Sequence, residues 1–562
     1  MSVSEQLAEL AEETWQNTLS SYPELATILG DGRGNDRLTD NSNDARDKRL
    51  AETKAFLARL EAIDAGSLSE DEKITADILR IGYESSIEGE VFNFHLWDID
   101  QLNGIQVGFP TLIQNFHPKK TTKDWRDLVS RYHAVKAKID NLISYLKEGA
   151  EKGYSAPRIA VERVISQLDG LLEKKDDDSI FVKVLEQLED GIEEQDSIRA
   201  DLKEAVQTAV LPSFEAFRET LKTVCLPKAR NNTGLWENPQ GDASYAYMVK
   251  SHLGKAMDPK DVHQIGIEQL ASIHQEMEEI AKDFGLSREE YSQKLSKEED
   301  NFHDSKEALV NEYQELIEKA YKAIPPLFGR LPKVGCTARS VEEFREQDAP
   351  AGFYNPPPED GSRPGLFYAN TYKPETRLRS NMACLAFHEA VPGHHLQIAL
   401  AMELDLPTIR KHGRFTAYVE GWALYTERLC DEIGLYEKPR DRFGMLGFQA
   451  WRAARLVVDT GLHALKWSRE RAVTYLAEAT VLPESEVVNE IDRYLIMPGQ
   501  GLSYKIGEIE IQKRRKEAKA ELGESFDIKE FHDCIIGSGA LPLETMNMLV
   551  RNWIDEKKAA LA

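Results

Sequence analysis

Apolar residues recur every three or four positions along most of the chain, which is the period of an amphipathic α-helix. The clearest stretch predicts one helix face made of Trp125, Leu128, Tyr132, Val135, Ile139, Leu142 and Leu146. A second helix is expected to start at Asp258 as N-cap, with Pro259 in the first helical position, and to stop at Gly285. Residues 159–224 and 304–324 show the same period. We interpret these faces as core positions.

Two stretches interrupt the helical pattern. Residues 226–257 are rich in Gly, Asn and Pro, and residues 325–366 contain several prolines and glycines. The second is expected to be a long loop, and such loops in compact proteins are functional or disordered. It ends in Gly365–Tyr372, the best strand candidate in the chain. Because the helical pattern returns at Arg379, the sequence predicts a mostly α protein with a small β-sheet near the motif that follows.

Charge and cysteine content narrow the class of protein. The chain has 562 residues, a formal net charge of −26 and five cysteines. A strongly acidic protein lacks the basic face that nucleic acid or an anionic membrane requires, so neither partner is expected. The N-terminal sequence lacks the basic and apolar segments of a signal peptide, and no run predicts a membrane span. With no Cys-x-x-Cys motif, we expect a cytoplasmic, reduced protein.

The densest cluster of chemically active residues is His388-Glu389-Ala390-Val391-Pro392-Gly393-His394-His395. Histidines at this density bind zinc, and an adjacent glutamate can activate water. In the usual H-E-x-x-H motif, two histidines share one helical face at i and i+4. Here Pro392 occupies i+4 and cannot bind a metal. A metal site therefore requires a broken helix.

A straight helix would separate these histidines. It would place His394 roughly 120° away from His388, and His395 about 10.5 Å along the axis. The Pro392-Gly393 pair offers the required break, because proline interrupts a helix and glycine tolerates unusual torsions. A loop there would return one histidine to His388. We take His394 as the second ligand and His395 as the alternative, with the spare histidine binding substrate or orienting a ligand.

The third ligand is expected on a following helix. Glu420 lies 26 positions after His394 (420 − 394) and is predicted to open that helix, where Gly421 lets the backbone approach its neighbour. Together with His388, these residues predict one Zn²⁺ per chain, and Glu389 becomes the general base. The competing interpretation is a plain helix-ending loop in which His388 and Glu389 pair structurally.

Five ordered motifs resemble the bacterial domain-of-unknown-function 885 family. They are HEAVPGHHLQ, VEGWALYTE, RAARLVVDTGLH, PGQGLSYKIG and FHDCIIGSGALPL, and the N-terminal YPELATILGD resembles the opening of that family. The family is similar to the helical gluzincin zinc peptidases, such as angiotensin-converting enzyme and the thermostable carboxypeptidases. That resemblance implies two helical lobes around a deep cleft and carries over His388, Glu389 and Glu420. His395-Leu396-Gln397 resembles the sequence after the second ligand in angiotensin-converting enzyme, and this resemblance favours His395 as the ligand. The spacing in the family favours His394 instead.

This resemblance also sets the expected organisation. Residues 1–330 would form an N-terminal helical region and residues 331–562 the metal-site region, both parts of one intertwined two-lobed unit. The expected partner is a peptide or peptide-like small substrate. The sequence leaves the oligomeric state open.

Further candidates lie outside the metal motif. Tyr504 follows Pro498-Gly499 and begins a predicted helix, where gluzincins place a tyrosine that stabilises the oxyanion; a packed aromatic is the alternative. Tyr494 is a weaker candidate. One predicted helix carries a polar stripe that forms either a buried ion network or a wall of the cleft: Arg452, Arg455, Asp459 and His463.

Four residues are the substrate-binding candidates: Tyr368, Asn370, Arg455 and His463. The first two lie on the predicted strand Phe367–Tyr372, which is either a plain strand or an edge to which an extended peptide adds. The sequence thus predicts a zinc-dependent hydrolase of peptide or amide bonds. The alternatives are a metal enzyme of non-hydrolytic or small-molecule chemistry and an inactive helical binding scaffold.

Overall fold

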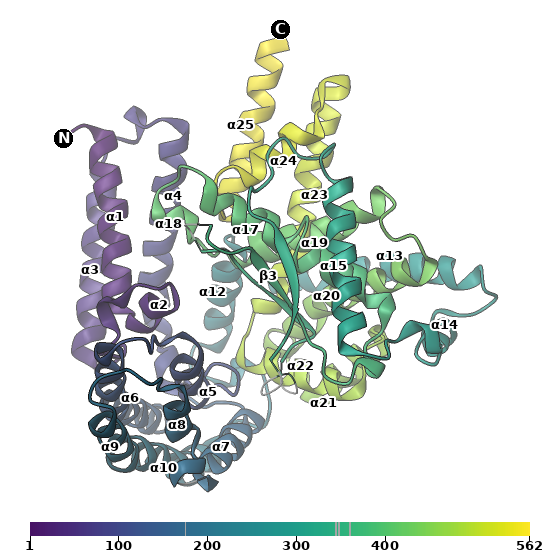
Figure 1. Cartoon of the computed structure of the whole chain (residues 1–562). Helices are drawn as coiled ribbons and strands as arrows, with labels where there is room; N and C mark the ends of the chain where they lie inside the picture. Colours follow the sequence, from purple (N-terminus) through teal and green to yellow (C-terminus); the bar gives the residue numbers. More distant parts are fainter. Residues whose placement is uncertain (175, 343–345, 347–348, 359–360, 562) are drawn as a thin grey trace. The chain divides into compact units, whose positions relative to one another are not determined.

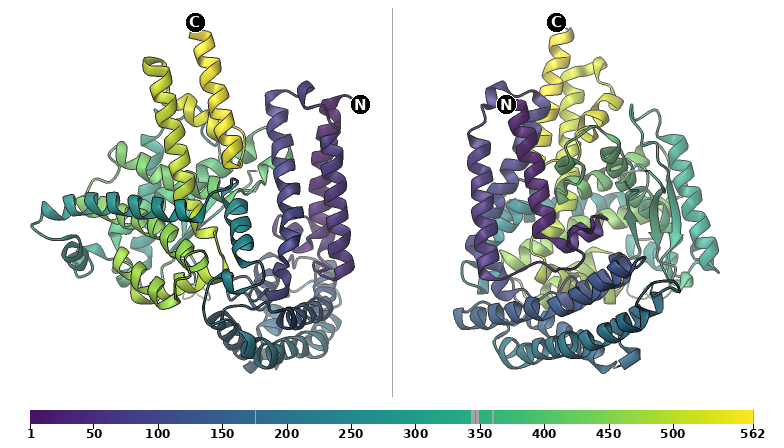
Figure 2. Two further views of the ribbon diagram at one scale, coloured as in Figure 1. Left: turned by 180° about the vertical axis from the view of Figure 1, so that it is seen from behind. Right: turned by 60° about the vertical axis from the view of Figure 1, so that its left-hand side comes forward.

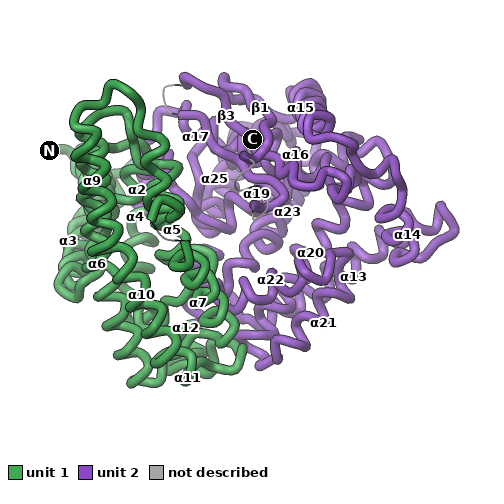
Figure 3. The backbone as a smooth tube through the Cα atoms, turned by 60° about the horizontal axis from the view of Figure 1, so that its bottom comes forward, with its two compact units in different colours: residues 1–68, 79–244 green, residues 69–78, 245–562 purple. Residues whose placement is uncertain are grey.

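The protein is mostly helical, with one small β-sheet, in the computed structural model (Figure 1). The structure describes residues 1–174, 176–342, 346, 349–358 and 361–561. These residues fall into two compact units, coloured separately in Figure 3: residues 1–68 and 79–244 form unit 1, and residues 69–78 and 245–562 form unit 2. No helix in the described ranges combines the length and apolar character that crossing a bilayer requires.

Unit 1 is built from α-helices. They are α1 (Val3–Ser21), α2 (Pro23–Ile28), α3 (Asn43–Glu61), most of α4 (Glu70–Gly89), α5 (Ile105–Thr111), α6 (Thr122–Lys152), α7 (Arg158–Glu173), α8 (Ile180–Lys183), α9 (Gln195–Ala205), α10 (Leu211–Thr220) and α11 (Leu226–Lys228). The predicted apolar face of residues 125–146 lies on α6 and forms the centre of the core. Trp125 and Tyr132 are fully buried there, and Phe181 stacks on Phe214 at 5.5 Å between ring centroids.

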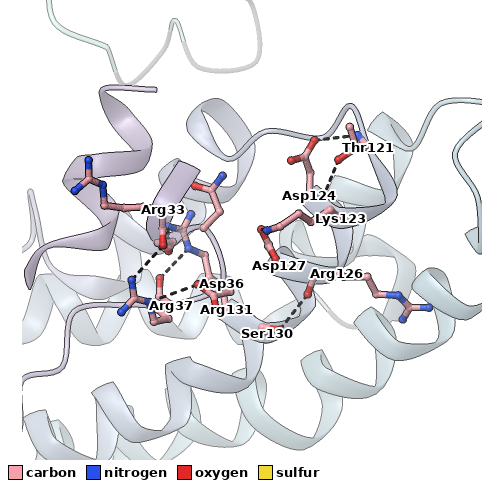
Figure 4. A network of polar contacts seen from close by, with 12 residues as sticks. Arg33, Asp36, Arg37, Thr121, Lys123, Asp124, Arg126, Asp127, Ser130 and Arg131 are labelled. Atoms are coloured by element: carbon pink, nitrogen blue, oxygen red, sulfur yellow. Dashed lines mark hydrogen bonds and ion pairs between the residues drawn. The ribbon is translucent and has the colours of Figure 1, made fainter. Parts of the chain in front are cut away.

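A buried arginine of α6 shows how this chain satisfies a buried charge. Arg131 is fully buried, and its guanidinium donates to the backbone oxygens of Arg37 and Gly34 at 2.9 and 2.8 Å and to the Thr27 hydroxyl at 2.5 Å. Its Nη1 lies 3.0 Å from Nδ1 of His117. Figure 4 shows Arg131 beside Arg37 in this network. All three nitrogens of the guanidinium therefore have partners.

Unit 2 carries the remaining α-helices and the sheet. Its helices are α12 (Gly241–Leu253, from Tyr245 onward), α13 (Pro259–Lys282), α14 (Arg288–Leu295), α15 (Lys306–Ala323), α16 (Met382–Glu389), α17 (His394–Glu403), α18 (Thr408–Lys411), α19 (Thr416–Glu432), α20 (Pro439–His463), α21 (Arg469–Ala479), α22 (Glu484–Ile496), α23 (Ser503–Leu522), α24 (Ile528–Ile536) and α25 (Leu543–Leu561). Asp258 caps α13 as predicted, and α13 lies along α20 (Figure 2). The units divide at residue 245 rather than at the expected boundary of 330/331, because α13 and α15 pack within the metal-site region.

The sheet has three strands in the order β1-β3-β2. They are β1 (Cys336–Ser340), β2 (Gly352–Asn355) and β3 (Gly365–Ala369). β3 pairs in parallel with β1, with Cys336 opposite Gly365, and antiparallel with β2. The predicted strand therefore exists but is central, so both of its edges are occupied and the idea that a peptide adds to it is wrong. Helix α15 packs on β1, and its Tyr313 ring meets Phe367 of β3 at 4.8 Å.

Three other expectations need correction. The helical stretch 159–224 is divided into α7 to α10, with 3₁₀ turns around α8 and a π-helix at Val206–Val210 between α9 and α10. Residues 226–257 contain α12, and the expected loop 325–366 contains β1 and β2. Both strands of that loop are only four or five residues long, too short to show a period of two. Its residues 343–345, 347–348 and 359–360 lie outside the described part of the chain.

Two glycines allow α19 and α23 to cross in contact. A Cβ on Gly421 would lie 2.5 Å from the backbone of Gly507, and a Cβ on Gly507 would lie 1.8 Å from the Ala417 carbonyl oxygen. The expected close approach at Gly421 is therefore confirmed, and its partner is α23. This crossing fixes the helix that carries Glu420 against the helix that begins with Ser503-Tyr504.

Candidate metal centre

The Pro392-Gly393 break folds the motif as predicted. Helix α16 ends at Glu389, four residues turn the chain, and α17 begins at His394. The Val391–Pro392 peptide bond is cis. Gly393 sits against the end of α16, where a Cβ would lie 1.9 Å from the carbonyl oxygen of His388. The indole Nε1 of Trp422, on α19, donates to the Pro392 carbonyl at 3.1 Å and fastens the turn to the helix that carries Glu420.

The turn brings His394 to His388. Their rings lie 4.8 Å apart between centroids and nearly perpendicular, at 85°. Nε2 of His388 and Nε2 of His394 each lie 3.5 Å from the same atom, Oε2 of Glu420. The carboxylate of Glu389 joins this group, because one ligand atom from each of His388, Glu389 and His394 lies within 4.8 Å of the others. Glu420 is the fifth residue of α19 rather than its first.

His395 points elsewhere. Its Nε2 donates to the Val334 carbonyl at 3.0 Å, and its Nδ1 accepts from the Tyr354 hydroxyl at 2.9 Å. Burial lowers the pKa of His395 to about 4, so the ring is neutral at physiological pH. With both nitrogens engaged, this side chain docks α17 on the sheet.

A second glutamate of α19 holds His388 in place. Nδ1 of His388 lies 2.8 Å from Oε1 of Glu427, a fully buried residue. The other carboxylate oxygen of Glu427, Oε2, accepts from Nε2 of Gln449 at 3.1 Å. Sequence reasoning missed Glu427. Its signal was present, because seven residues are close to two helical turns and put Glu427 on the same face of α19 as Glu420.

Burial and charge set the protonation of this cluster. Burial opposes the charged form of His388, but hydrogen bonds with Glu420 and Glu427 outweigh it and raise its pKa to about 9. Burial raises the pKa of Glu389, although His394, His388 and Arg452 counteract it. For Glu420, burial is outweighed by His388 and His394, which hold its pKa well below its ordinary value.

These residues fit a zinc ion. Ligand atoms about 2.0–2.2 Å from a tetrahedral zinc lie about 3.3–3.6 Å from one another. The two distances of 3.5 Å to Oε2 of Glu420 fall within that range. Nε2 of His394 is the nitrogen that faces Glu420, and Nδ1 of the same ring is buried without a hydrogen-bond partner in the described chain. The carboxylate on Nδ1 of His388 is the usual outer partner of a zinc-binding histidine.

The polar stripe of α20 is buried, with Arg452 6% and Arg455 3% exposed and Asp459 and His463 fully buried. Asp459 accepts from the Tyr245 hydroxyl at 2.6 Å and from the Gly499 amide at 3.0 Å. Nε2 of His463 lies 2.9 Å from the Tyr494 carbonyl oxygen. These contacts make Asp459 and His463 parts of a buried network.

The tyrosine candidates and Arg455 meet at the start of α23. Nε of Arg455 donates to the Tyr494 hydroxyl at 2.8 Å, and its Nη2 lies 3.1 Å from Oε2 of Glu490. The Tyr504 ring lies under two guanidinium groups, 4.6 Å from that of Arg455 and 5.8 Å from that of Arg452. Tyr504 is the second residue of α23, as predicted, and is partly exposed.

The strand candidates have structural partners. The Tyr368 ring stacks on Phe353 of β2 at 5.0 Å. The Asn370 side chain donates to the carbonyls of Glu346 and Ala349 at 2.8 and 2.7 Å and accepts from the Tyr372 amide at 2.9 Å. Asn370 thus binds two described residues that lie between β1 and β2 in the chain.

Two solved structures are similar to this chain. The crystal structure of a protein from Colwellia psychrerythraea matches with a TM-score of 0.91 and 28% identity, over 99% of this chain and 100% of that one. One from Shewanella oneidensis, of unknown function, matches with a TM-score of 0.78 and 19% identity, over 97% and 99% of the two chains, and so shares the fold. Both are described as a "putative lipoprotein". No curated protein matches.

The five motifs named above lie within the part of the chain that a family model covers. That model, described as "Bacterial protein of unknown function (DUF885)", matches residues 23–550. The chain belongs to the domain-of-unknown-function 885 family.

Proposed function

We propose that the chain is a zinc-dependent hydrolase of peptide or amide bonds, with one Zn²⁺ held by His388, His394 and Glu420. One observation carries the proposal: Nε2 of each histidine lies 3.5 Å from the same carboxylate oxygen of Glu420. When bound, zinc supplies Lewis-acid charge and lowers the pKa of a water at its open position. A relation to the helical gluzincin peptidases is part of this proposal.

Glu389 is the general base of the proposed reaction. Its carboxylate belongs to the same cluster, and burial raises its pKa, which favours a group that both accepts and returns a proton. Glu389 takes a proton from the attacking water and passes it to the leaving nitrogen. The Tyr504 hydroxyl is proposed to donate to the developing oxyanion, and two guanidinium groups hold its ring.

Metal analysis and one substitution test this function. Purified protein should contain one zinc per chain, and chelation should abolish cleavage of a peptide library until zinc is restored. Glu389→Gln should keep the zinc and lower kcat by about 10²–10⁴, because glutamine cannot accept the proton. Glu437→Gln, at an exposed glutamate, serves as the matched control.

The two alternatives correspond to different results of this test. Protein without stoichiometric metal would indicate an inactive binding scaffold. Zinc without cleavage of any library peptide would indicate other chemistry on a small molecule.

Cellular location is a separate proposal. The acidic sequence with free thiols favours the cytoplasm, and the structure contains five free cysteines. The two similar structures are each described as a "putative lipoprotein", which favours the cell envelope instead. We keep the cytoplasm as the prediction, and fractionation of cells followed by immunodetection tests it.

A further inference from the structure

Arg452 is buried without the partners that a buried arginine normally has. Its Nε and Nη1 are buried and have no hydrogen-bond partner. Arg131 of α6, also buried, has a partner for every guanidinium nitrogen. A buried charge without hydrogen bonds is unfavourable, so the site calls for a group from outside the chain.

Other arginines with an unpartnered nitrogen differ in one respect. Five of them use another nitrogen to bind a carboxylate or a carbonyl: Arg218, Arg230, Arg379, Arg410 and Arg440. Arg514 forms an ion pair with Glu517. Arg452 has no hydrogen bond or ion pair to a carboxylate or a carbonyl from its side chain in the described part of the chain. Aromatic rings hold it instead, with Phe448 and Trp451 each 4.7 Å and Tyr504 5.8 Å from the guanidinium carbon. These rings fix its position but accept few hydrogen bonds.

Arg455 adds a second donor one helical turn away. Its Nη1 is also buried without a partner. Its guanidinium lies over two of the three rings that contact Arg452, 4.4 Å from Trp451 and 4.6 Å from Tyr504. Glu490 is shared between Arg455, at 3.1 Å, and Arg493, at 3.4 Å. Arg455 and Arg493 therefore share one carboxylate, and neither guanidinium group has it to itself.

The anion would lie near the proposed reaction centre. The charge of Arg452 acts on both Glu389 and Glu427, and α16 packs against α20. Trp451 and Tyr504 are partly exposed, so both arginines lie beside side chains that extend to the protein surface. Planar guanidinium groups bind carboxylates and phosphates through two parallel N–H donors, and of these two anions a peptide substrate carries the carboxylate.

We propose that Arg452 and Arg455 bind the terminal carboxylate of a peptide substrate, so that the enzyme removes residues from the C-terminal end. This inference rests on the proposed hydrolase for its substrate class. Binding of the carboxylate itself does not depend on hydrolysis. An acidic side chain of a substrate also carries a carboxylate, and it is the alternative ligand that the test must distinguish from the terminal carboxylate.

Cleavage of three related peptides tests the proposal. The substrates are benzoyl-Gly-Phe with a free carboxylate, its C-terminal amide, and benzoyl-Gly-Glu whose terminal carboxyl is amidated. Wild-type kcat/KM should be at least about 100-fold higher for the free acid than for either amide. In Arg452→Gln this preference should fall below about 5-fold, mainly through a higher KM, because the amide never used the guanidinium. Arg452→Lys should recover part of it, since the charge stays and the paired donors are lost.

Direct binding separates this proposal from the proposed hydrolase. Calorimetry with benzoylglycine and benzoylglycinamide on purified protein should show binding of the acid only, lost in Arg452→Gln. Arg471→Gln is the control, because that arginine also stacks on a tryptophan, Trp467 at 4.0 Å, but is exposed. If no peptide is cleaved and the acid still binds through Arg452, the hydrolase fails and the carboxylate site stands. Three results would overturn the terminal-carboxylate site. They are equal wild-type kcat/KM for the free acid and its amide, an equal loss of kcat/KM on both in Arg452→Gln, and a higher kcat/KM for the glutamyl amide than for the free acid.

Discussion

Nδ1 of His388 lies 2.8 Å from Oε1 of Glu427, while Nε2 of the same ring lies 3.5 Å from Oε2 of Glu420. Both glutamates come from one face of α19, seven residues apart. One helix therefore supplies a carboxylate to each side of a single imidazole. The inner carboxylate is placed to bind a metal, and the outer one fixes which nitrogen of His388 faces it.

Removing the outer carboxylate should weaken metal binding without removing a ligand. Glu427→Gln should raise the dissociation constant for zinc by about 10- to 100-fold, because a neutral amide orients and polarises His388 less well. Competition against a zinc chelator gives the constant. A variant with unchanged affinity would show that Glu427 acts only in packing.

The adjacent histidines should respond oppositely. His394→Ala should lose zinc, whereas His395→Ala should keep stoichiometric zinc and unfold at a lower temperature, because it loses hydrogen bonds to Tyr354 and Val334. Elemental analysis and thermal melting of both variants separate the roles. Zinc lost from His395→Ala and kept by His394→Ala would reverse the proposed ligand set.

The glycine crossing should be intolerant of a methyl group. Gly421→Ala places a Cβ 2.5 Å from the Gly507 backbone, so α19 must shift, at a cost of about 1–3 kcal/mol, and Glu420 moves with it. Gly170→Ala on α7 is the control, since its Cβ would meet nothing within 4 Å and should stabilise by about 0.5–1 kcal/mol. Denaturant unfolding and zinc content measure both effects. Equal behaviour of the two variants would exclude a steric role for the crossing.

Asp459 should make stability depend on pH. Burial raises its pKa from an ordinary value of 3.8 to about 7, against the hydrogen bonds from Tyr245 and Gly499 that lower it. Between pH 3.8 and about 7 the folded state keeps the proton of Asp459 and the unfolded state releases it. The contribution of this proton to the free energy of unfolding is therefore full below about pH 4 and is lost as pH rises through about 7. From pH 4 to 8, the wild type should lose on the order of a few kcal/mol of unfolding free energy relative to Asp459→Asn.

Paired denaturant titrations at pH 4, 6 and 8 check this difference. Asp405→Asn, at an exposed aspartate, should follow the wild type at each pH. A constant gap between wild type and Asp459→Asn would mean that Asp459 is ionised in the folded protein throughout.

The sequence alone determined the helical class, the position of several helices and the break in the metal motif. Asp258-Pro259 starts α13 and Pro392-Gly393 ends the helical path before His394, because capping and torsion limits act between neighbours in the chain. It also predicted a strand within Gly365–Tyr372, which the structure has at Gly365–Ala369, but not the position of that strand in the sheet. The partners β1 and β2 have too few residues to show a periodic pattern.

Only the tertiary structure decided which side chains converge. His395 is separated from the metal cluster by partners 41 and 61 residues away, Tyr354 and Val334, which no local pattern reveals. Likewise, Arg452 and Asp459 share one stripe of α20. The Asp459 carboxylate accepts hydrogen bonds from Tyr245 and Gly499, whereas Nε and Nη1 of Arg452 have no hydrogen-bond partner among the described residues. Helix periodicity assigns a residue to a face, whereas the groups opposite that face depend on how distant segments pack.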